Sequence, residues 1–243
     1  MAILRVPSVQ HLARNWRSDP AAIARLLVRL AMNPPRFNYS PLYDAVRDLL
    51  VLGVSYEQVV QGIRRITRAT IRENFLSVLP LIWDHFAGIS PDFCQTVERR
   101  YYPVGRGLMV PFDPPMIYGV SGNLYFPWFI FWRQNSLAQE RLSLFVTLVD
   151  EVLMQDPDLE HARFQILDFS CPDRTESRTL TVIDAREIPR VNEERKTKML
   201  EAFAEGYLLA VAILSGRTGQ DPPADSRRDE RDGPDPNQPG LFD

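Results

Sequence analysis

Residues 116–132, MIYGVSGNLYFPWFIFW, decide how this chain folds. The segment holds two tyrosines, three phenylalanines, two tryptophans and two isoleucines, and it contains no charged residue. Removing this much apolar surface from water is the largest favourable contribution that a segment of this length can make to folding. We therefore expect the rest of the chain to pack around it.

The residue pattern of this segment predicts a β-hairpin. Residues 119–123, GVSGN, supply the turn, because glycine readily adopts the positive φ angles that tight hairpin turns require. The two arms are then residues 116–118 and 124–132. Pro127 lies in the second arm and has no N–H to donate, so it marks a bulge, a sheet edge or a strand end.

Both faces of the second arm are apolar. A strand of this kind is typically covered on both sides, and we expect helices to cover it. Exposed aromatic rings can also stack on nucleic-acid bases, but burial in a core is the simpler interpretation. The residues expected on one face are Tyr125, Pro127, Phe129 and Phe131, and those on the other are Leu124, Phe126, Trp128, Ile130 and Trp132.

Residues 1–100 are predicted to form a helical region. Apolar residues recur there at helical spacing, and the segments are separated by proline, glycine and capping residues. The expected helices are 8–33 with a start signal at Ser18, Asp19 and Pro20, a second from Ser40 to Gly53, a third capped by Ser55, and 71–86 with a kink at Pro80.

Residues 101–215 are predicted to form an α+β region that contains the aromatic hairpin. Tyr102, Pro103 and the glycines at 105 and 107 indicate a loop before it. After it we expect a helix over 137–154 capped by Ser136, strands over 162–170 and 178–185, and a helix over 191–214. The predicted fold class is α+β: a helical N-terminal layer packed with a C-terminal mixed ββαββα unit.

The composition is that of an ordinary globular protein, with 45% hydrophobic residues and a net charge of −3. Cys94 and Cys171 have neither metal-ligand nor disulfide-framework spacing, which fits a reducing cytoplasm. The start lacks the apolar core of a signal peptide, and no run of 18 apolar residues predicts a membrane span. Arginine far outnumbers lysine, which suggests a bacterium with a GC-rich genome.

Residues 216–243 have a different composition from the rest of the chain. They are rich in Asp, Arg, Pro and Gly and contain almost nothing apolar before Leu241. Such a segment cannot offset its ordering entropy by burial, so a disordered tail is predicted. The tail nevertheless ends in QPGLFD, with two large apolar residues at its tip.

The terminal sequence resembles the short peptide by which bacterial replication and repair proteins bind the DNA polymerase sliding clamp. Gln238, Leu241 and Phe242 stand at the first, fourth and fifth places of that peptide. The resemblance implies that Leu241 and Phe242 enter an apolar pocket while the Gln238 amide hydrogen-bonds at its rim. Binding would be weak, on the order of micromolar to tens of micromolar. Chance occurrence of these three residues is the alternative.

A basic stripe is predicted in QGIRRITRATIRE. Arg64, Arg68 and Arg72 recur every four residues, with Arg65 beside them, so one helix would present them to phosphates. The alternative is a solvated face paired with Glu57 and Glu73. Residues 50–63 also resemble a helix-turn-helix loosely, with Gly53 in the turn.

Two acidic residues at predicted strand ends offer a catalytic alternative. Asp168 and Asp184, with Glu187 nearby, would hold a metal ion if their carboxylates converged. The lysine that accompanies such acids in one nuclease superfamily is missing, and strand-end acids are the simpler interpretation. The sequence names no catalytic residue, no metal ligand set and no cofactor, and it leaves enzyme status open.

Three functions follow from these observations. The first is an accessory protein of DNA replication or repair, recruited by the sliding clamp. The second is a metal-dependent nuclease or hydrolase that uses Asp168 and Asp184. The third is a regulatory adaptor that binds another protein and no DNA.

Overall fold

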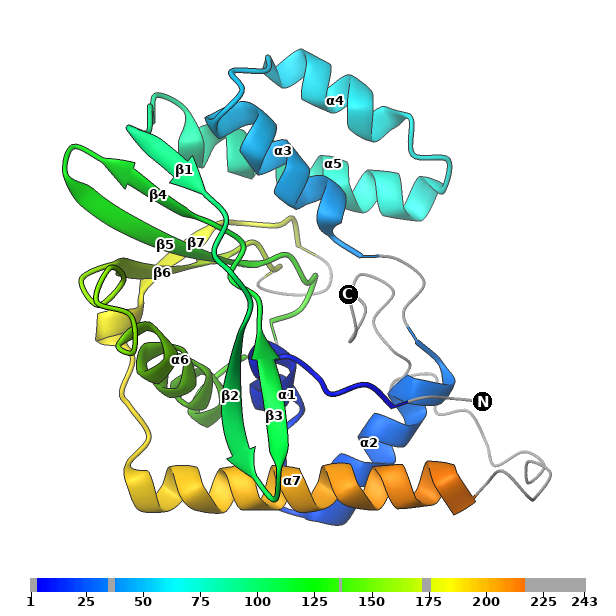
Figure 1. Cartoon of the computed structure of the whole chain (residues 1–243). Helices are drawn as coiled ribbons and strands as arrows, with labels where there is room; N and C mark the ends of the chain where they lie inside the picture. The colour runs from blue at the N-terminus through cyan, green and yellow to red at the C-terminus, as the bar shows by residue number, and fades with distance from the viewer. Residues whose placement is uncertain (1–3, 35–37, 136, 172–175, 217–243) are drawn as a thin grey trace.

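A computed structural model describes residues 4–34, 38–135, 137–171 and 176–216. The fold is α+β, as predicted, with a five-stranded mixed sheet, a separate two-stranded sheet and helices around both (Figure 1). The helices are α1 (Val9–Asn15), α2 (Pro20–Met32), α3 (Ser40–Leu50), α4 (Tyr56–Arg64), α5 (Ala69–Phe86), α6 (Glu140–Leu153), α7 (Glu193–Gly216) and the short 3-10 helix η1 (Ala185–Glu187).

The large sheet has the strand order β1-β4-β5-β6-β7. Strands β5 and β6 are parallel and are joined through α6, whereas the other neighbours are antiparallel. The predicted order ββαββα is therefore confirmed for the chain from β4 to α7. The strands are β1 (Phe93–Gln95), β2 (Arg100–Gly105), β3 (Leu108–Phe112), β4 (Ile117–Val120), β5 (Asn123–Ile130), β6 (Arg163–Asp168) and β7 (Thr181–Asp184).

The aromatic hairpin is formed by β4 and β5, and Tyr118 lies opposite Tyr125. Its turn is tighter than expected and consists of Ser121 and Gly122, which have φ angles of 51° and 74°. Two positive φ values in succession are characteristic of the hairpin turn that matches strand twist. Pro127 lies beyond the last β4–β5 pair and pairs only with β6, so its missing N–H costs no bond to β4.

Both faces of β5 are covered, as expected. On one face Tyr43 of α3 contacts Phe129 edge-on, with ring centroids 5.6 Å apart, and Phe86 of α5 packs there too. On the other face Trp128 contacts Phe145 of α6 at 5.1 Å. Helices do not cover this second face alone, because Phe112 of β3 stacks on Trp128 at 5.5 Å.

The β2–β3 hairpin corrects the prediction of a loop at residues 102–107. Its strands alternate buried and exposed residues, with Tyr102 and Val104 inward on β2 and Val110 and Phe112 inward on β3. Arg106 and Gly107 form the turn at φ angles of 50° and 76°. The alternation was present in the sequence, but the glycines and prolines around it favoured a loop. Strand β1, within the predicted helical region, was also missed.

Several predicted helix boundaries are confirmed by their caps. Asp19 accepts hydrogen bonds from the backbone N–H groups of Ala21 and Ala22, and it separates α2 from α1 within the predicted segment 8–33. Ser55 and Gln58 form a reciprocal capping box at the start of α4. Helix α6, in contrast, begins at Glu140 rather than residue 137, and Ser136 lies outside the described residues.

Helix α7 packs along α2 on the side of the molecule away from α4 (Figure 1). Gly206 allows this close packing, because a Cβ atom there would lie 2.6 Å from Ile23 Cβ and 2.8 Å from the Pro20 carbonyl oxygen. Near the start of α7, Lys196 is buried and contacts Glu151 of α6 at 2.6 Å. The helix is thus fixed to the body near its start and along its middle.

Candidate functional site

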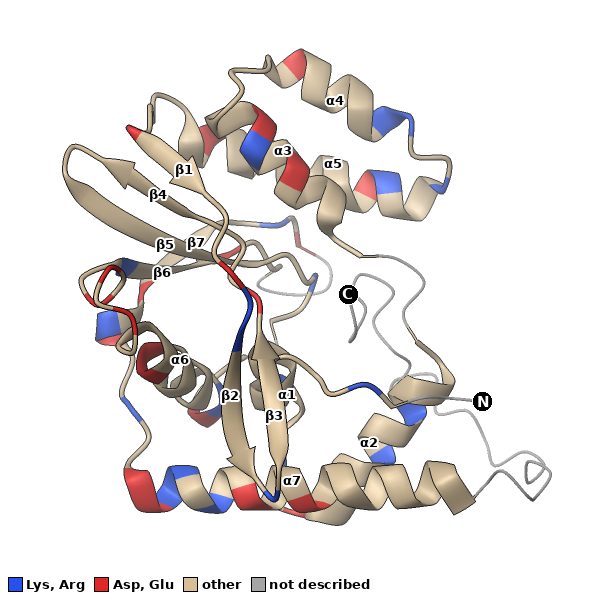
Figure 2. Ribbon diagram, in the orientation of Figure 1, with Lys and Arg blue, Asp and Glu red and all other residues tan. Residues whose placement is uncertain are grey.

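The predicted basic residues do not lie on one helix. Arg64 is the last residue of α4, Arg65 follows it, Arg68 precedes α5, and Arg72 lies in the first turn of α5. Helix α4 ends before Arg68, so the four-residue spacing reflects a turn between two helices. The turn still brings the four arginines to one corner of the molecule, where Figure 2 shows them gathered at neighbouring ends of α4 and α5.

This arginine corner, defined by Arg64, Arg65, Arg68 and Arg72, is open to solvent. The first three are exposed, whereas Arg72 is half-buried and donates to the carbonyl oxygen of Ile66 at 3.0 Å. In the described part of the chain, no ion pair joins these arginines to the acids expected as partners, Glu57 and Glu73. Three guanidinium groups are therefore available to bind phosphates.

The two helices of the loose helix-turn-helix are present. Helices α3 and α4 are joined by residues 51–55, and Gly53 lies in the turn with a φ of 60°. Helix α4 is the outermost of the group formed with α3 and α5 (Figure 1). Its exposed side includes Glu57, Gln61 and Arg64. The arrangement can present α4 and the arginine corner to a partner, but it does not by itself identify one.

Asp168 and Asp184 are not brought together. In the antiparallel β6–β7 pair, Asp184 lies opposite Gln165 and Asp168 lies opposite Thr181, which separates the two acids by about 10 Å along the strands. Because Gln165 and Asp168 are three residues apart, the two acids also project from opposite faces of the sheet. The described residues contain no group of three or more His, Cys, Asp or Glu that could hold a metal ion.

Each acid instead has a local partner. Asp168 accepts from the Asn135 side-chain amide at 2.6 Å and from the Ser170 backbone N–H at 2.9 Å. Asp184 caps η1 and is paired with the Arg186 guanidinium, whose hydrogen bonds lower the pKa of that carboxyl. These contacts give the acids a role in turn structure, which was the simpler of the two interpretations.

Asp168 lines a polar hollow of about 530 Å³ beside the carboxyl ends of β5 and β6. Ligands of open α/β sheets commonly bind at such an edge. Here both oxygens of the one carboxylate already accept hydrogen bonds, and the remaining lining is neutral. The lining residues are Gln134, Asn135, Asp168, Ser170, Cys171, Thr179 and Thr181.

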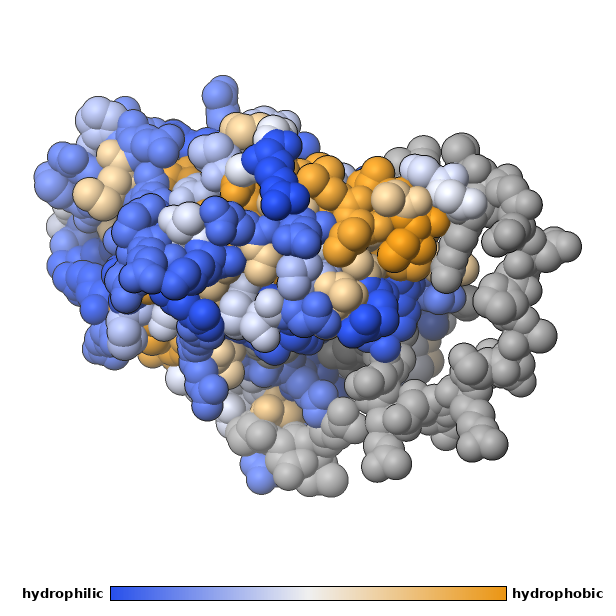
Figure 3. All heavy atoms as spheres, turned by 90° about the horizontal axis from the view of Figure 1, so that it is seen from below, coloured by the Kyte–Doolittle hydropathy of each residue, from blue (hydrophilic) through white to orange (hydrophobic). Residues whose placement is uncertain are grey.

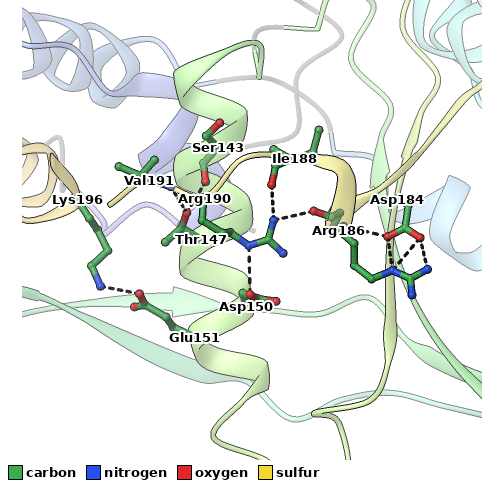
Figure 4. A network of polar contacts seen from close by, with 11 residues as sticks. Ser143, Thr147, Asp150, Glu151, Asp184, Arg186, Ile188, Arg190, Val191 and Lys196 are labelled. Atoms are coloured by element: carbon green, nitrogen blue, oxygen red, sulfur yellow. Dashed lines mark hydrogen bonds and ion pairs between the residues drawn. The ribbon is translucent and has the colours of Figure 1, made fainter. Parts of the chain in front are cut away.

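Residues 184–191 form a connecting segment, the strap, that crosses α6 and is held to it by hydrogen bonds (Figure 4). Arg190 donates to Asp150 at 3.2 Å and to the carbonyl oxygens of Ala185 and Ile188 at 2.7 and 2.6 Å. The Val191 N–H donates to Thr147 Oγ1 at 3.0 Å, and that hydroxyl donates to an α6 carbonyl. The strap accounts for Asp184 and its neighbours as parts of the scaffold.

Lys196 is the most enclosed cation of this network. Burial would lower its pKa, but hydrogen bonds to Glu151 and Glu193 outweigh that effect and hold the pKa above its ordinary value. Tyr102 of β2 donates to the other Glu151 oxygen at 2.5 Å, and burial with this contact raises the tyrosine's pKa. A lysine held in its charged form serves as a link between α7, α6 and β2 rather than as a base.

A surface that the sequence analysis did not identify lies on the C-terminal half of α7. Leu208, Leu209, Val211 and Ile213 are between 36% and 43% exposed. Seen from below, they belong to the apolar area toward the α7 end of the molecule (Figure 3). The sequence indicated this surface through residues 206–216, GYLLAVAILSG, which contain no charged residue. The helix is therefore apolar on all sides there instead of on one side.

Helix α7 is long enough and apolar enough to cross a membrane, judged by length and composition alone. About a third of its most apolar window is buried inside the protein. The fold around it is of the water-soluble type.

The predicted clamp-binding residues, Gln238, Leu241 and Phe242, lie outside the described residues, as does the predicted tail beyond Gly216. The described part of the chain ends at the C-terminus of α7.

Comparison with known proteins gives no further guide. No protein-family model matches the chain, and no curated protein matches it significantly.

Proposed function

We propose that this chain is an accessory factor of bacterial DNA replication or repair, which acts in the cytoplasm and is recruited to the DNA polymerase sliding clamp by its C-terminal peptide. The observation that carries the proposal is the placement of Gln238, Leu241 and Phe242 at the tip of a polar segment of otherwise unrelated composition. The segment around this pair is too polar to form a core that could bury it. A pocket on a partner protein would bury both side chains.

The arginine corner supports the same role. Exposed guanidinium groups of Arg64, Arg65 and Arg68, with no acidic partner among the described residues, suit contact with the DNA that a sliding clamp encircles. Such contacts are independent of base sequence, which is appropriate for a factor that is positioned by a clamp. The net charge of −3 means that this local patch, and not the whole molecule, would provide the attraction.

The deciding experiment measures binding of the full chain to a purified bacterial sliding clamp by surface plasmon resonance. The wild type is expected to bind with a Kd on the order of micromolar to tens of micromolar. Leu241→Ala with Phe242→Ala should abolish binding, because both anchors are lost, while Asn237→Ala, just outside the motif, should leave it unchanged. No binding by the wild type, or equal binding by the double variant, would overturn the proposal.

Contact with DNA is tested separately by a gel shift at low and moderate salt. Arg64→Ser, Arg65→Ser and Arg68→Ser together should remove a shift that the wild type shows at low salt. If the wild type shows no shift, the chain acts as an adaptor that binds protein and no DNA.

A further inference from the structure

The apolar surface on α7 forms a continuous patch. Leu208 and Ala212 lie one turn apart on one row of the helix, and Leu209 and Ile213 lie one turn apart on the next. We call this surface the α7 patch and define it as Leu208, Leu209, Val211, Ala212 and Ile213. All five side chains are exposed, and Figure 3 shows the apolar area to which they belong.

The α7 patch is held rigidly in place. On the opposite side of the same helical turns, Gly206 and Ala210 are buried, and Gly206 lies directly against Ile23 of α2. Earlier along the helix, Met199 and Phe203 are completely buried. Little conformational entropy would therefore be lost from the backbone when a partner binds the patch.

The charges on α7 itself argue against a lipid surface as the partner. Glu201 and Glu205 are exposed on α7 just before the patch, whereas helices that lie on membranes carry Lys and Arg on their polar side. The burial of Met199 and Phe203 also ties the first half of α7 to the protein core. The occupant is therefore another protein surface.

A second copy of the chain fits this surface well. In a two-fold symmetric dimer the same patch faces itself, so a charge near the symmetry axis would lie close to its own copy and be repelled. The stretch 206–216 contains none. Ala212 and Ser215 are small and exposed, which allows two α7 helices to approach closely where they cross.

The area of the patch is also adequate. Its apolar surface is roughly 300 Å² per copy, which is the size of the largest apolar patch on a typical monomer, and such patches are often functional. Two such patches with their polar rims bury about 1,000 Å² or slightly more, at the lower limit for a specific interface. We propose that this protein forms a reversible dimer in which the α7 patches of two copies pack against each other.

Sedimentation velocity of the full chain between about 1 and 200 μM tests the dimer directly. The wild type is expected to show a reversible monomer–dimer equilibrium in this range, because interfaces at the small end of the size range are typically weak and transient. Leu209→Glu with Ile213→Glu places four carboxylates in the contact and should raise the dimer Kd at least a hundredfold. Met154→Glu introduces one such carboxylate at the residue that follows α6, which is 67% exposed, and it should leave the equilibrium unchanged.

Two further variants separate patch-to-patch packing from exchange of C-terminal segments between copies. Leu241→Ser with Phe242→Ser removes the apolar tip of the chain and should leave a dimer of packed α7 patches intact. Ala212→Cys should give a disulfide-linked dimer on a non-reducing gel, above the level of the wild type with its native Cys94 and Cys171. This second test does not depend on whether the glutamate variant folds.

The proposal is overturned by any of four results: a wild-type monomer up to 200 μM, a glutamate variant that folds and still dimerises, loss of the dimer in the Leu241→Ser, Phe242→Ser variant, or no added cross-linking by Ala212→Cys.

Discussion

Strand β5 and the C-terminal half of α7 are both almost free of charge, yet they differ in how much of their surface is covered. From Phe126 to Ile130, every residue of β5 is buried, with α3 and α5 on one face and α6 and β3 on the other. On α7, Ala210 is buried against the body while Leu209 and Val211 beside it are exposed. An apolar composition therefore favours burial of a segment, but the number of neighbouring helices and strands decides how much of its surface is buried within the same chain.

The largest effect is expected in the fully covered region. Phe129 is 2% exposed and contacts rings of α3, α5 and the segment after β6, so Phe129→Ala should lower the free energy of unfolding by about 3–5 kcal/mol. Urea unfolding would measure it. Phe93→Ala is the matched control, because Phe93 is 47% exposed on strand β1 and its loss should cost less than about 1 kcal/mol. Equal effects would contradict the difference in coverage described for the two residues.

A second effect is a dependence of folding stability on pH, and it arises from a histidine that packs against the same aromatic segment. His11 of α1 is buried 6.0 Å from the Trp132 ring, and burial, with a smaller effect of the Arg14 charge, lowers its pKa to about 3. The unfolded chain binds a proton near pH 6.5 that the folded chain does not bind until about pH 3. Folding stability is therefore intact above pH 6.5 and falls as the pH decreases below it, by about 3 kcal/mol at pH 4.

Urea unfolding at pH 7.5, 6, 5 and 4 would reveal this contribution as the difference between the wild type and His11→Gln. The carboxylates of the protein contribute to acid sensitivity in both proteins and cancel in the comparison. The variant should lose less stability on acidification than the wild type. Parallel curves for the two proteins would mean that His11 takes up its proton in the folded state.

The third effect concerns how α7 is attached. Gly206→Ala would place a Cβ atom 2.8 Å from a backbone oxygen of α2, so the two helices must move apart, and the free energy of unfolding should fall by about 1–3 kcal/mol. Gly62→Ala in α4 meets nothing within 4 Å and should raise stability by about 0.5–1 kcal/mol through the better helix propensity of alanine. Thermal unfolding of both variants would test the contrast, and stabilisation by Gly206→Ala would contradict it.

The smallest effect is expected on the uncovered side of α7. Leu209→Ser changes a residue that is 41% exposed, so at about 1 μM protein the unfolding free energy should change by no more than about 0.5 kcal/mol. Leu200→Ser, at a residue only 7% exposed on the same helix, should be far more destabilising because it removes a buried apolar side chain and leaves a cavity. A large loss of stability with Leu209→Ser would show that this side of α7 is covered within the monomer.

Local signals predicted the parts of the fold whose causes lie within a few residues. Asp19 and Ser55 were predicted as helix starts because a side chain and the N–H groups it accepts from are adjacent in sequence. The β4–β5 hairpin was predicted from its turn and apolar arms. The β2–β3 hairpin was missed because its alternating pattern is interrupted by Pro103 and Pro111, which ordinarily argue against a strand.

The candidate sites depended on longer-range geometry and were predicted less well. Arg64 and Arg72 were expected on one helix, but α4 ends at the first of them, and a turn brings the arginines together instead. Asp168 and Asp184 both end strands, as predicted, yet an antiparallel register separates them. The exposed side of α7 was not predicted at all, because a sequence shows that residues are apolar without showing whether a neighbour covers them.

By itself, the sequence determined the fold class, the order ββαββα, the helix caps and the central position of the aromatic segment. Each of these follows from residue periodicity, backbone preferences and local hydrogen bonding, which act over short distances along the chain. Tertiary structure alone decided which faces are covered, where Asp168 and Asp184 lie relative to each other, and that one side of α7 is left to solvent. These depend on strand register and on how many elements surround each surface, and only contacts between distant segments fix them.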